Sequence, residues 1–206
     1  MVDAYTPSGM KSTNVTRVSH LVSLQDRCLR QGHLGGVLWF TGLPASGKKT
    51  IAFQLERRLF EAGYEVFAFD STWQRKGLSS DLGFSREDRR ENIRRAGELA
   101  AIMARSGVIA ISAFVSPYSR DRAAARATVG ENFHEIFMNV PLDVCMARDT
   151  QDRYVRASHG EFLDFTGVTA PYESPVKPEV TLSAEQGVDE SIDRLTDYVN
   201  AHFRNI

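Results

Sequence analysis

The segment from Gly42 to Lys48 restricts the fold of this chain more than any other part of the sequence. It reads Gly-Leu-Pro-Ala-Ser-Gly-Lys and fits the phosphate-binding pattern G-x-x-x-x-G-K-[ST] up to its last position. The glycines allow backbone conformations in which successive N–H groups converge on anionic oxygens at the start of a helix. Lys48 brings a charge to the β- and γ-phosphates of a nucleotide. The loop therefore predicts nucleotide binding.

The residues on either side of the loop have the periodicities that such a loop needs. Residues 37–41 form a short apolar run typical of a buried strand. Residues 50–60 place apolar side chains at helical spacing. Strand, glycine-containing loop and helix follow one another in the order of the motif, so we expect a genuine phosphate loop.

Strands and helices are predicted to alternate along the rest of the chain. This alternation favours a mostly parallel sheet with helices on both faces, the three-layer α/β sandwich of the P-loop NTPase type. We expect a flexible N-terminal extension over residues 1–17 and one domain over residues 18–206. The expected strands are 37–41, 65–69, 107–113, 134–140 and 179–182, and the expected helices are 18–31, 48–62, 86–105, 118–129, 141–148 and 188–203.

Composition and charge exclude several classes of function. The formal net charge of the 206 residues is −1, so no long-range field attracts nucleic acid or an anionic membrane. No apolar run approaches the length of a membrane span, and residues 1–14 lack the apolar core of a secretory signal. Cys28 and Cys145 form no C-x-x-C pair and are typical of reduced structural cysteines. We expect a cytoplasmic protein.

Ligands of parallel α/β sheets bind beyond the carboxyl ends of the strands, so the loops after the strands are the expected site. These loops are 42–49, 70–85, 114–118 and 149–178, and the last is long enough to predict a lid. Asp70 ends the second predicted strand, where its carboxylate would meet a metal or a hydroxyl proton. The alternative is that Asp70 caps a helix or turn.

Five stretches in and beside these loops carry a further signal: 38–43, 81–85, 91–95, 113–118 and 165–167. Together they resemble adenylylsulfate kinases, which use MgATP to phosphorylate the 3′-hydroxyl of adenosine 5′-phosphosulfate. The resemblance extends from about residue 18 to 203 and implies the same fold and reaction, with ATP and Mg²⁺ as cofactors and the product PAPS. It also implies a homodimer and a functional association with ATP sulfurylase.

The resemblance assigns roles to individual residues. The implied catalytic residues are Lys48, Asp70, which would hold Mg²⁺ through water, and Ser116, which is a phosphoryl carrier or a simple polar contact. The implied nucleotide-binding residues are Gly42, Leu43, Pro44, Ala45, Ser46, Gly47, Lys48, Lys49, Thr50 and Arg148. The implied substrate-binding residues are Arg75, Phe84, Arg89, Asn92, Ser116, Pro117, Phe165, Thr166 and Gly167, with Phe84 and Phe165 enclosing the adenine.

Three positions depart from the pattern of the family. Lys49 stands where a Ser or Thr hydroxyl binds Mg²⁺, and a cation there repels the metal. Thr72 replaces a carboxylate after the second strand, and Gln151 replaces a lysine of the lid that Arg153 or Arg156 would have to compensate. Three interpretations stay open: an active adenylylsulfate kinase, a catalytically impaired paralogue that binds nucleotides as a regulatory subunit, and a kinase for a different nucleotide acceptor.

Overall fold

A single parallel β-sheet forms the centre of the molecule. The computed structural model describes residues 20–204, so the predicted N-terminal extension lies outside the described part of the chain. Every pair of adjacent strands is parallel, and the strand order is β2-β3-β1-β4-β5. The strands are β1 (Gly36–Thr41), β2 (Val66–Asp70), β3 (Ile109–Ala113), β4 (Phe133–Asn139) and β5 (Val180–Ser183).

Five of the six predicted helices agree with the structure to within one residue, whereas the first, predicted over 18–31, begins only at Leu24. Two short helices were not predicted. α3 and α7 are these additions, and both lie in segments that the sequence indicated as loops after strands. The helices are α1 (Leu24–Gln31), α2 (Lys48–Glu61), α3 (Ser71–Arg75), α4 (Arg86–Arg105), α5 (Ser119–Val129), α6 (Leu142–Ala147), α7 (Arg153–Ser158) and α8 (Val188–Phe203).

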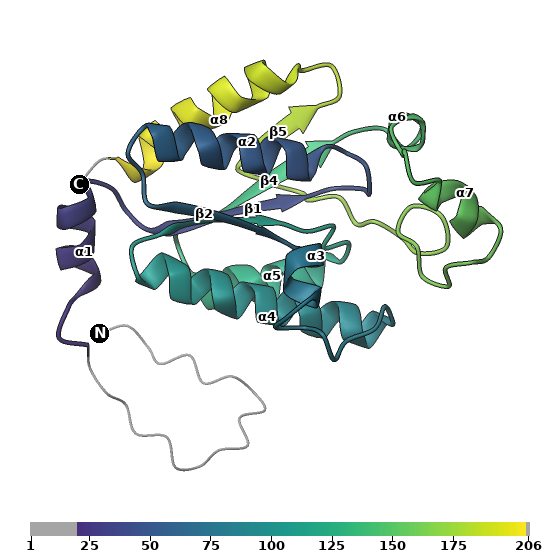
Figure 1. Cartoon of the computed structure of the whole chain (residues 1–206), viewed down its shortest axis with the longest axis horizontal. Helices are drawn as coiled ribbons and strands as arrows, with labels where there is room; N and C mark the ends of the chain where they lie inside the picture. The colour runs from purple at the N-terminus through teal and green to yellow at the C-terminus, as the bar shows by residue number, and fades with distance from the viewer. Residues whose placement is uncertain (1–19, 205–206) are drawn as a thin grey trace, which may run out of the picture.

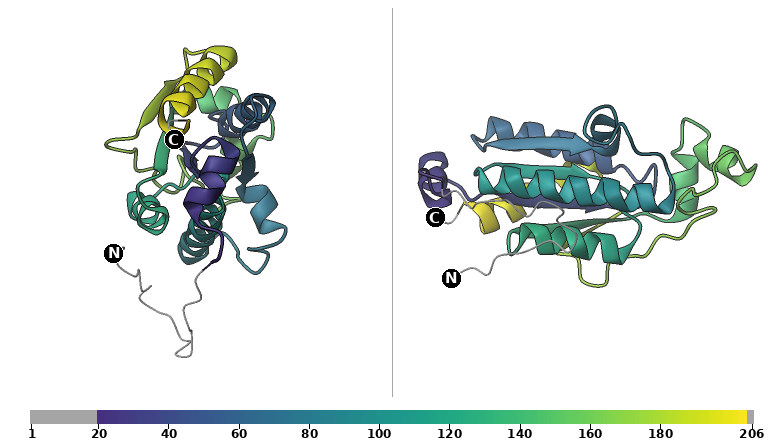
Figure 2. Two further views of the ribbon diagram at one scale, coloured as in Figure 1. Left: turned by 90° about the vertical axis from the view of Figure 1, so that its left-hand side faces the viewer. Right: turned by 90° about the horizontal axis from the view of Figure 1, so that it is seen from below.

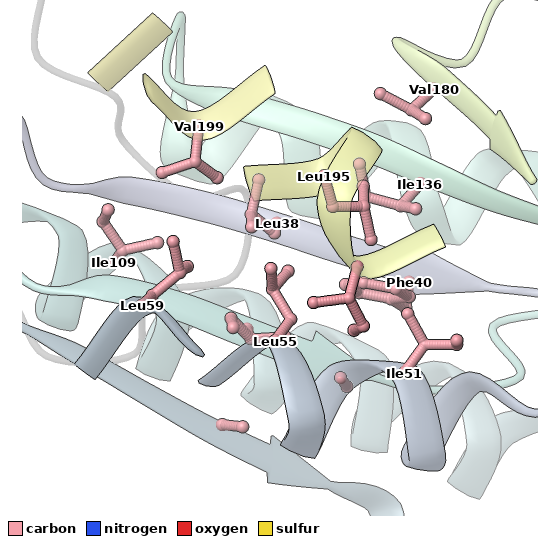
Figure 3. Packing of buried hydrophobic residues seen from close by; sticks show 14 of the residues in the cluster. Leu38, Phe40, Ile51, Leu55, Leu59, Ile109, Ile136, Val180, Leu195 and Val199 are labelled. Atoms are coloured by element: carbon pink, nitrogen blue, oxygen red, sulfur yellow. The ribbon is translucent and has the colours of Figure 1, made fainter. Parts of the chain in front are cut away.

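Alternate side chains of the central strand build two hydrophobic layers. Leu38 and Phe40 of β1 point into a core shared with α2 and α8, which Figure 3 shows as facing rows of aliphatic side chains. Val37 and Trp39 point to the opposite face and pack against α4 and α5. Both faces of the sheet are therefore covered, as the continuous apolar strands predicted (Figure 1). No helix of residues 20–204 is long and apolar enough to cross a membrane.

The short helices α3, α6 and α7 lie at the carboxyl ends of the strands (Figure 1). α6 and α7 lie beyond this end of the sheet, whereas α1 lies at the opposite end (Figures 1 and 2). α3 follows β2 directly, and α2 begins at the end of the phosphate loop. The loops predicted to contain the site thus meet at one edge of the sheet.

Candidate functional site

The phosphate loop connects β1 to the first turn of α2 with three residues at positive φ. Gly42, Ala45 and Gly47 have φ of 152°, 57° and 91°. A Cβ on Gly42 would lie 2.9 Å from the backbone oxygen and the Cβ of Met138, so only glycine fits there. These backbone conformations support the anion-binding arrangement that the sequence predicted.

The ammonium group of Lys48 is folded back onto the loop. It donates hydrogen bonds to the carbonyl oxygens of Gly42 (2.8 Å) and Leu43 (2.6 Å) and to the Ser46 hydroxyl (3.1 Å). Burial above all, together with the nearby charges of Arg153 and Lys49, lowers the pKa of Lys48 to about 7. A nucleotide would therefore meet a lysine that is already inside the loop.

The neighbouring Lys49 points out of the loop toward α3. Its Nζ forms an ion pair with Asp70 and donates a hydrogen bond to Thr72 Oγ1 (2.9 Å). The other carboxylate oxygen of Asp70 accepts from the backbone N–H of Trp73 (2.7 Å), which makes Asp70 the N-cap of α3. Two of the three positions that depart from the family pattern are therefore in direct contact.

These residues do not fit direct coordination of Mg²⁺ by the protein. The hydroxyl of the phosphate-loop motif is replaced by Lys49, and both oxygens of Asp70 are already bonded. Within residues 20–204, no group of three or more His, Cys, Asp and Glu side chains is arranged to hold a metal ion. Asp70 as a water-bridged metal ligand stays a prediction, whereas its alternative role as a helix cap is confirmed.

α7 and the segment before it pack directly on the phosphate loop. The hydroxyl of Tyr154 donates to the carbonyl oxygen of Pro44 (2.9 Å), and Tyr154 belongs to a hydrophobic cluster with Cys145, Leu43 and Ala45. Two arginines were predicted as replacements for the lysine that Gln151 displaces. Arg153 lies near enough to Lys48 to lower the pKa of that lysine. Arg156 instead forms an ion pair with Glu161 (2.7 Å).

A second set of side chains surrounds Phe84, a residue that is 64% exposed. The guanidinium carbons of Arg75 and Arg89 lie 4.4 and 5.6 Å from the centre of this ring. Neither arginine forms an ion pair among the residues described, and the Nε of Arg75 is buried with no hydrogen-bond partner. Two cations beside an exposed aromatic ring are suited to an anionic nucleotide.

The two predicted adenine-binding phenylalanines lie on loops that Arg89 joins. Arg89 donates to the carbonyl oxygens of Phe84 (2.9 Å) and Asp164 (2.6 Å), the latter next to Phe165. The ring of Phe165 packs edge-on against Tyr154, with centroids 5.1 Å apart. The structure thus connects the predicted substrate loop to the element that covers the phosphate loop.

The hydroxyl of Ser116 is buried and fully engaged. It accepts from the indole N–H of Trp39 (3.1 Å) and donates to Thr41 Oγ1 (3.0 Å), and its backbone has a φ of 38°. Sequence reasoning missed Trp39 and Thr41 as partners, although both belong to the strand that leads into the phosphate loop. The arrangement favours a positioning contact over an exposed nucleophile.

The other predicted residues occupy varied positions around the same edge. Asn92 is buried and accepts from the amide of Gln74, which no motif had indicated. Thr166 is buried with a hydroxyl that lacks a hydrogen-bond partner.

The predicted nucleotide-binding residues outside the loop lie at the surface. Thr50 is exposed on α2, and Arg148 donates to the carbonyl oxygen of Ala184 (3.4 Å). The remaining two substrate residues are Pro117, whose carbonyl oxygen accepts from Glu173, and Gly167, which packs on Leu43 and Leu142.

Comparison with known proteins relates this arrangement to one group of enzymes. Residues 34–183 match the family model described as adenylylsulphate kinase. An adenylyl-sulfate kinase from Clostridium acetobutylicum is 43% identical over 193 residues, which are 93% of this chain and 96% of that protein. One from Shewanella amazonensis is 45% identical and covers 87% of this chain and 92% of its own length.

Solved structures agree with these relatives. The Mycobacterium tuberculosis APS kinase in complex with AMPPNP and APS is 38% identical, has a TM-score of 0.77, and covers 80% of this chain and 96% of its own. A sugar kinase from a Janibacter species, at 18% identity and a TM-score of 0.52 over 81% of this chain and 95% of its own, shares the P-loop kinase fold alone. The chain belongs to the adenylylsulfate kinase family.

Proposed function

We propose that this protein transfers the γ-phosphoryl group of ATP to the 3′-hydroxyl of adenosine 5′-phosphosulfate, which yields PAPS and ADP. One observation carries the proposal: the phosphate loop lies at the same end of the sheet as the loop between α3 and α4 (Figure 1), where Phe84 stands beside two arginines that form no ion pair within residues 20–204. The first site is suited to ATP and the second to an adenine nucleotide with an anionic tail.

The side chains support direct transfer between the two nucleotides. Lys48 would exchange its carbonyl partners for phosphate oxygens and offset their charge. Arg75 and Arg89 would hold the phosphosulfate, while Phe84 and Phe165 orient the adenine. In-line phosphoryl transfer needs no covalent intermediate, which agrees with the engaged hydroxyl of Ser116.

The proposal extends to the cofactor and partners that the resemblance implied. Mg²⁺ accompanies ATP in this assignment, bound by phosphates and water. The protein acts in the cytoplasm, to which its two free, buried cysteines are suited. We propose a homodimer and a functional association with ATP sulfurylase; a related APS kinase from Thiobacillus denitrificans is described as hexameric.

Product formation with a variant of the exposed ring tests the proposal. The wild type should form ADP from ATP only when adenosine phosphosulfate is present. Phe84→Ala should weaken binding of that substrate about tenfold, because stacking on one base contributes roughly 1–3 kcal/mol. Phe60→Ala is the matched control, since its ring is also exposed but lies near the far end of α2. Calorimetry and a coupled ADP assay measure both effects.

Three outcomes would contradict the proposal in different ways. ATP and substrate binding without ADP formation would identify a catalytically impaired paralogue. ADP formation with another adenylylated or cytidylylated acceptor, but not with adenosine phosphosulfate, would identify a different nucleotide kinase. Equal effects of the Phe84 and Phe60 substitutions would remove the predicted adenine site.

A further inference from the structure

Lys49, Asp70 and Thr72 form a cluster, here named the ammonium cluster, at the position where phosphate-loop kinases bind a divalent metal. The three residues come from the first turn of α2, the end of β2 and the start of α3. The Lys49 ammonium contacts a carboxylate oxygen of Asp70 and the hydroxyl of Thr72 (2.9 Å). Two of the departures from the motif therefore act as one unit.

The cluster is built to hold one positive charge without a metal. Asp70 has a side chain only 6% exposed, and its second oxygen is fixed by the N–H of Trp73. A buried carboxylate needs a partner, and Lys49 supplies it. Thr72 offers the ammonium a neutral acceptor where a second carboxylate would attract a divalent ion.

The same cation is within reach of a ligand. The side chain of Lys49 is 52% exposed, and it directly follows Lys48 at the N-terminus of α2. Phosphate oxygens bound at that terminus would meet the ammonium, whereas Mg²⁺ at the same place would be repelled by it. Coordination of the metal by Asp70 would also require the ion pair to break.

We propose that Lys49 is a resident cation that replaces the protein-bound metal, so that this chain binds ATP with little dependence on Mg²⁺. The inference rests on the proposed function for its ligand, ATP, and goes beyond it in assigning the charge that neutralises the phosphates. Lys48 and Lys49 together provide two positive charges, one inside the loop and one at its outer edge.

Calorimetric titration of the full chain with ATP, in EDTA and in MgCl₂, tests the proposal. The wild-type dissociation constants in the two buffers should agree within about threefold. Lys49→Ser/Thr72→Asp restores the hydroxyl and the carboxylate, so its affinity should become at least about tenfold higher with Mg²⁺ than without it. Arg30→Ser is the control, because it removes an exposed positive charge from α1, at the opposite end of the sheet from the candidate site (Figure 1), and should behave like the wild type.

A second variant separates charge from metal binding. Lys49→Met keeps the length of the side chain and removes its charge, so it should weaken ATP binding in EDTA by about tenfold. Thermal melting of each variant shows whether it is folded, and the double variant remains informative if Lys49→Met alone leaves Asp70 unpaired and the chain unfolded.

The outcomes distinguish this proposal from the proposed function. Two results would overturn the proposal that Lys49 replaces the metal. One is wild-type ATP binding that is tenfold or more tighter with Mg²⁺, and the other is a double variant whose ATP affinity gains no dependence on Mg²⁺. Absence of ATP binding in both buffers would overturn both proposals. Metal-independent ATP binding without phosphorylation of adenosine phosphosulfate would remove only the proposed function.

Discussion

At the scale of single residues, Lys48 is the buried cation of the phosphate loop. Its ammonium is buried among two carbonyl oxygens and the Ser46 hydroxyl, with the charges of Lys49 and Arg153 nearby. Burial brings its pKa to about 7. At this group the folded chain thus binds fewer protons than the unfolded chain between pH 7 and 10.5, so Lys48 makes stability rise with pH in that range.

We predict that ATP binding at pH 8 is accompanied by proton uptake. Phosphate oxygens favour the charged lysine, so its pKa rises on binding and about one proton is taken from the buffer. ATP affinity should consequently fall as the pH rises above 7. Calorimetry in buffers with different ionisation enthalpies measures the uptake. Lys48→Arg, which stays charged, should show none, and an uptake that survives this substitution would refute the assignment.

At the scale of elements, α7 attaches the long loop after β4 to the phosphate loop. The sequence predicted residues 149–178 as an irregular lid, because six helical residues are too few to show a periodicity. The structure gives this segment a buried anchor in Tyr154, whose backbone N–H and hydroxyl bond Asp149 (3.0 Å) and Pro44 (2.9 Å). The segment predicted as a lid is therefore attached to the phosphate loop.

Tyr154→Phe should weaken this attachment. Loss of the hydroxyl removes one hydrogen bond, which contributes about 1 kcal/mol, and should lower both the free energy of unfolding and the affinity for ATP. Tyr64→Phe is the matched control: its hydroxyl bonds Asn200 (2.7 Å) near the C-terminal helix, so stability should fall while ATP affinity stays unchanged. Urea denaturation and calorimetry measure the two quantities. Equal ATP affinity in both variants would show that α7 does not support the loop.

At the scale of the whole molecule, the fold could be predicted because its strands are buried on both faces. Residues 37–41 and 107–113 are continuous apolar runs, which the helices between them separate clearly. The site was predicted less completely. Lys49 and Thr72 each departed from a motif, but their contact bridges 23 positions and no local pattern expresses it. The partners of Ser116 were hidden for the same reason, since they come from a neighbouring strand.

Arg122 connects α5 with the sheet and with two of the loops at its carboxyl edge through hydrogen bonds. Its guanidinium, on α5, bonds Glu135 of β4 (2.7 Å), and the same group holds the carbonyl oxygens of Ser116 (2.8 Å) and Glu173 (2.7 Å). Arg122 and Glu135 are nearly buried, with 4% and 11% of their side chains exposed. The residue therefore supports both stability and the geometry of the site.

Arg122→Met should destabilise the chain by about 3–5 kcal/mol, because it leaves the carboxylate of Glu135 buried with only its weaker contact to Arg126 at 3.7 Å. Arg122→Met/Glu135→Met should recover part of this loss, since no unpaired charge then remains. Both variants release the carbonyl oxygens of Ser116 and Glu173, so both should bind adenosine phosphosulfate more weakly. Urea denaturation and calorimetry separate the effects. Full recovery of substrate affinity in the double variant would contradict this prediction. It would mean that the single variant loses affinity because of the unpaired charge of Glu135, and not because the hydrogen bond from Arg122 to the carbonyl oxygen of Ser116 is lost.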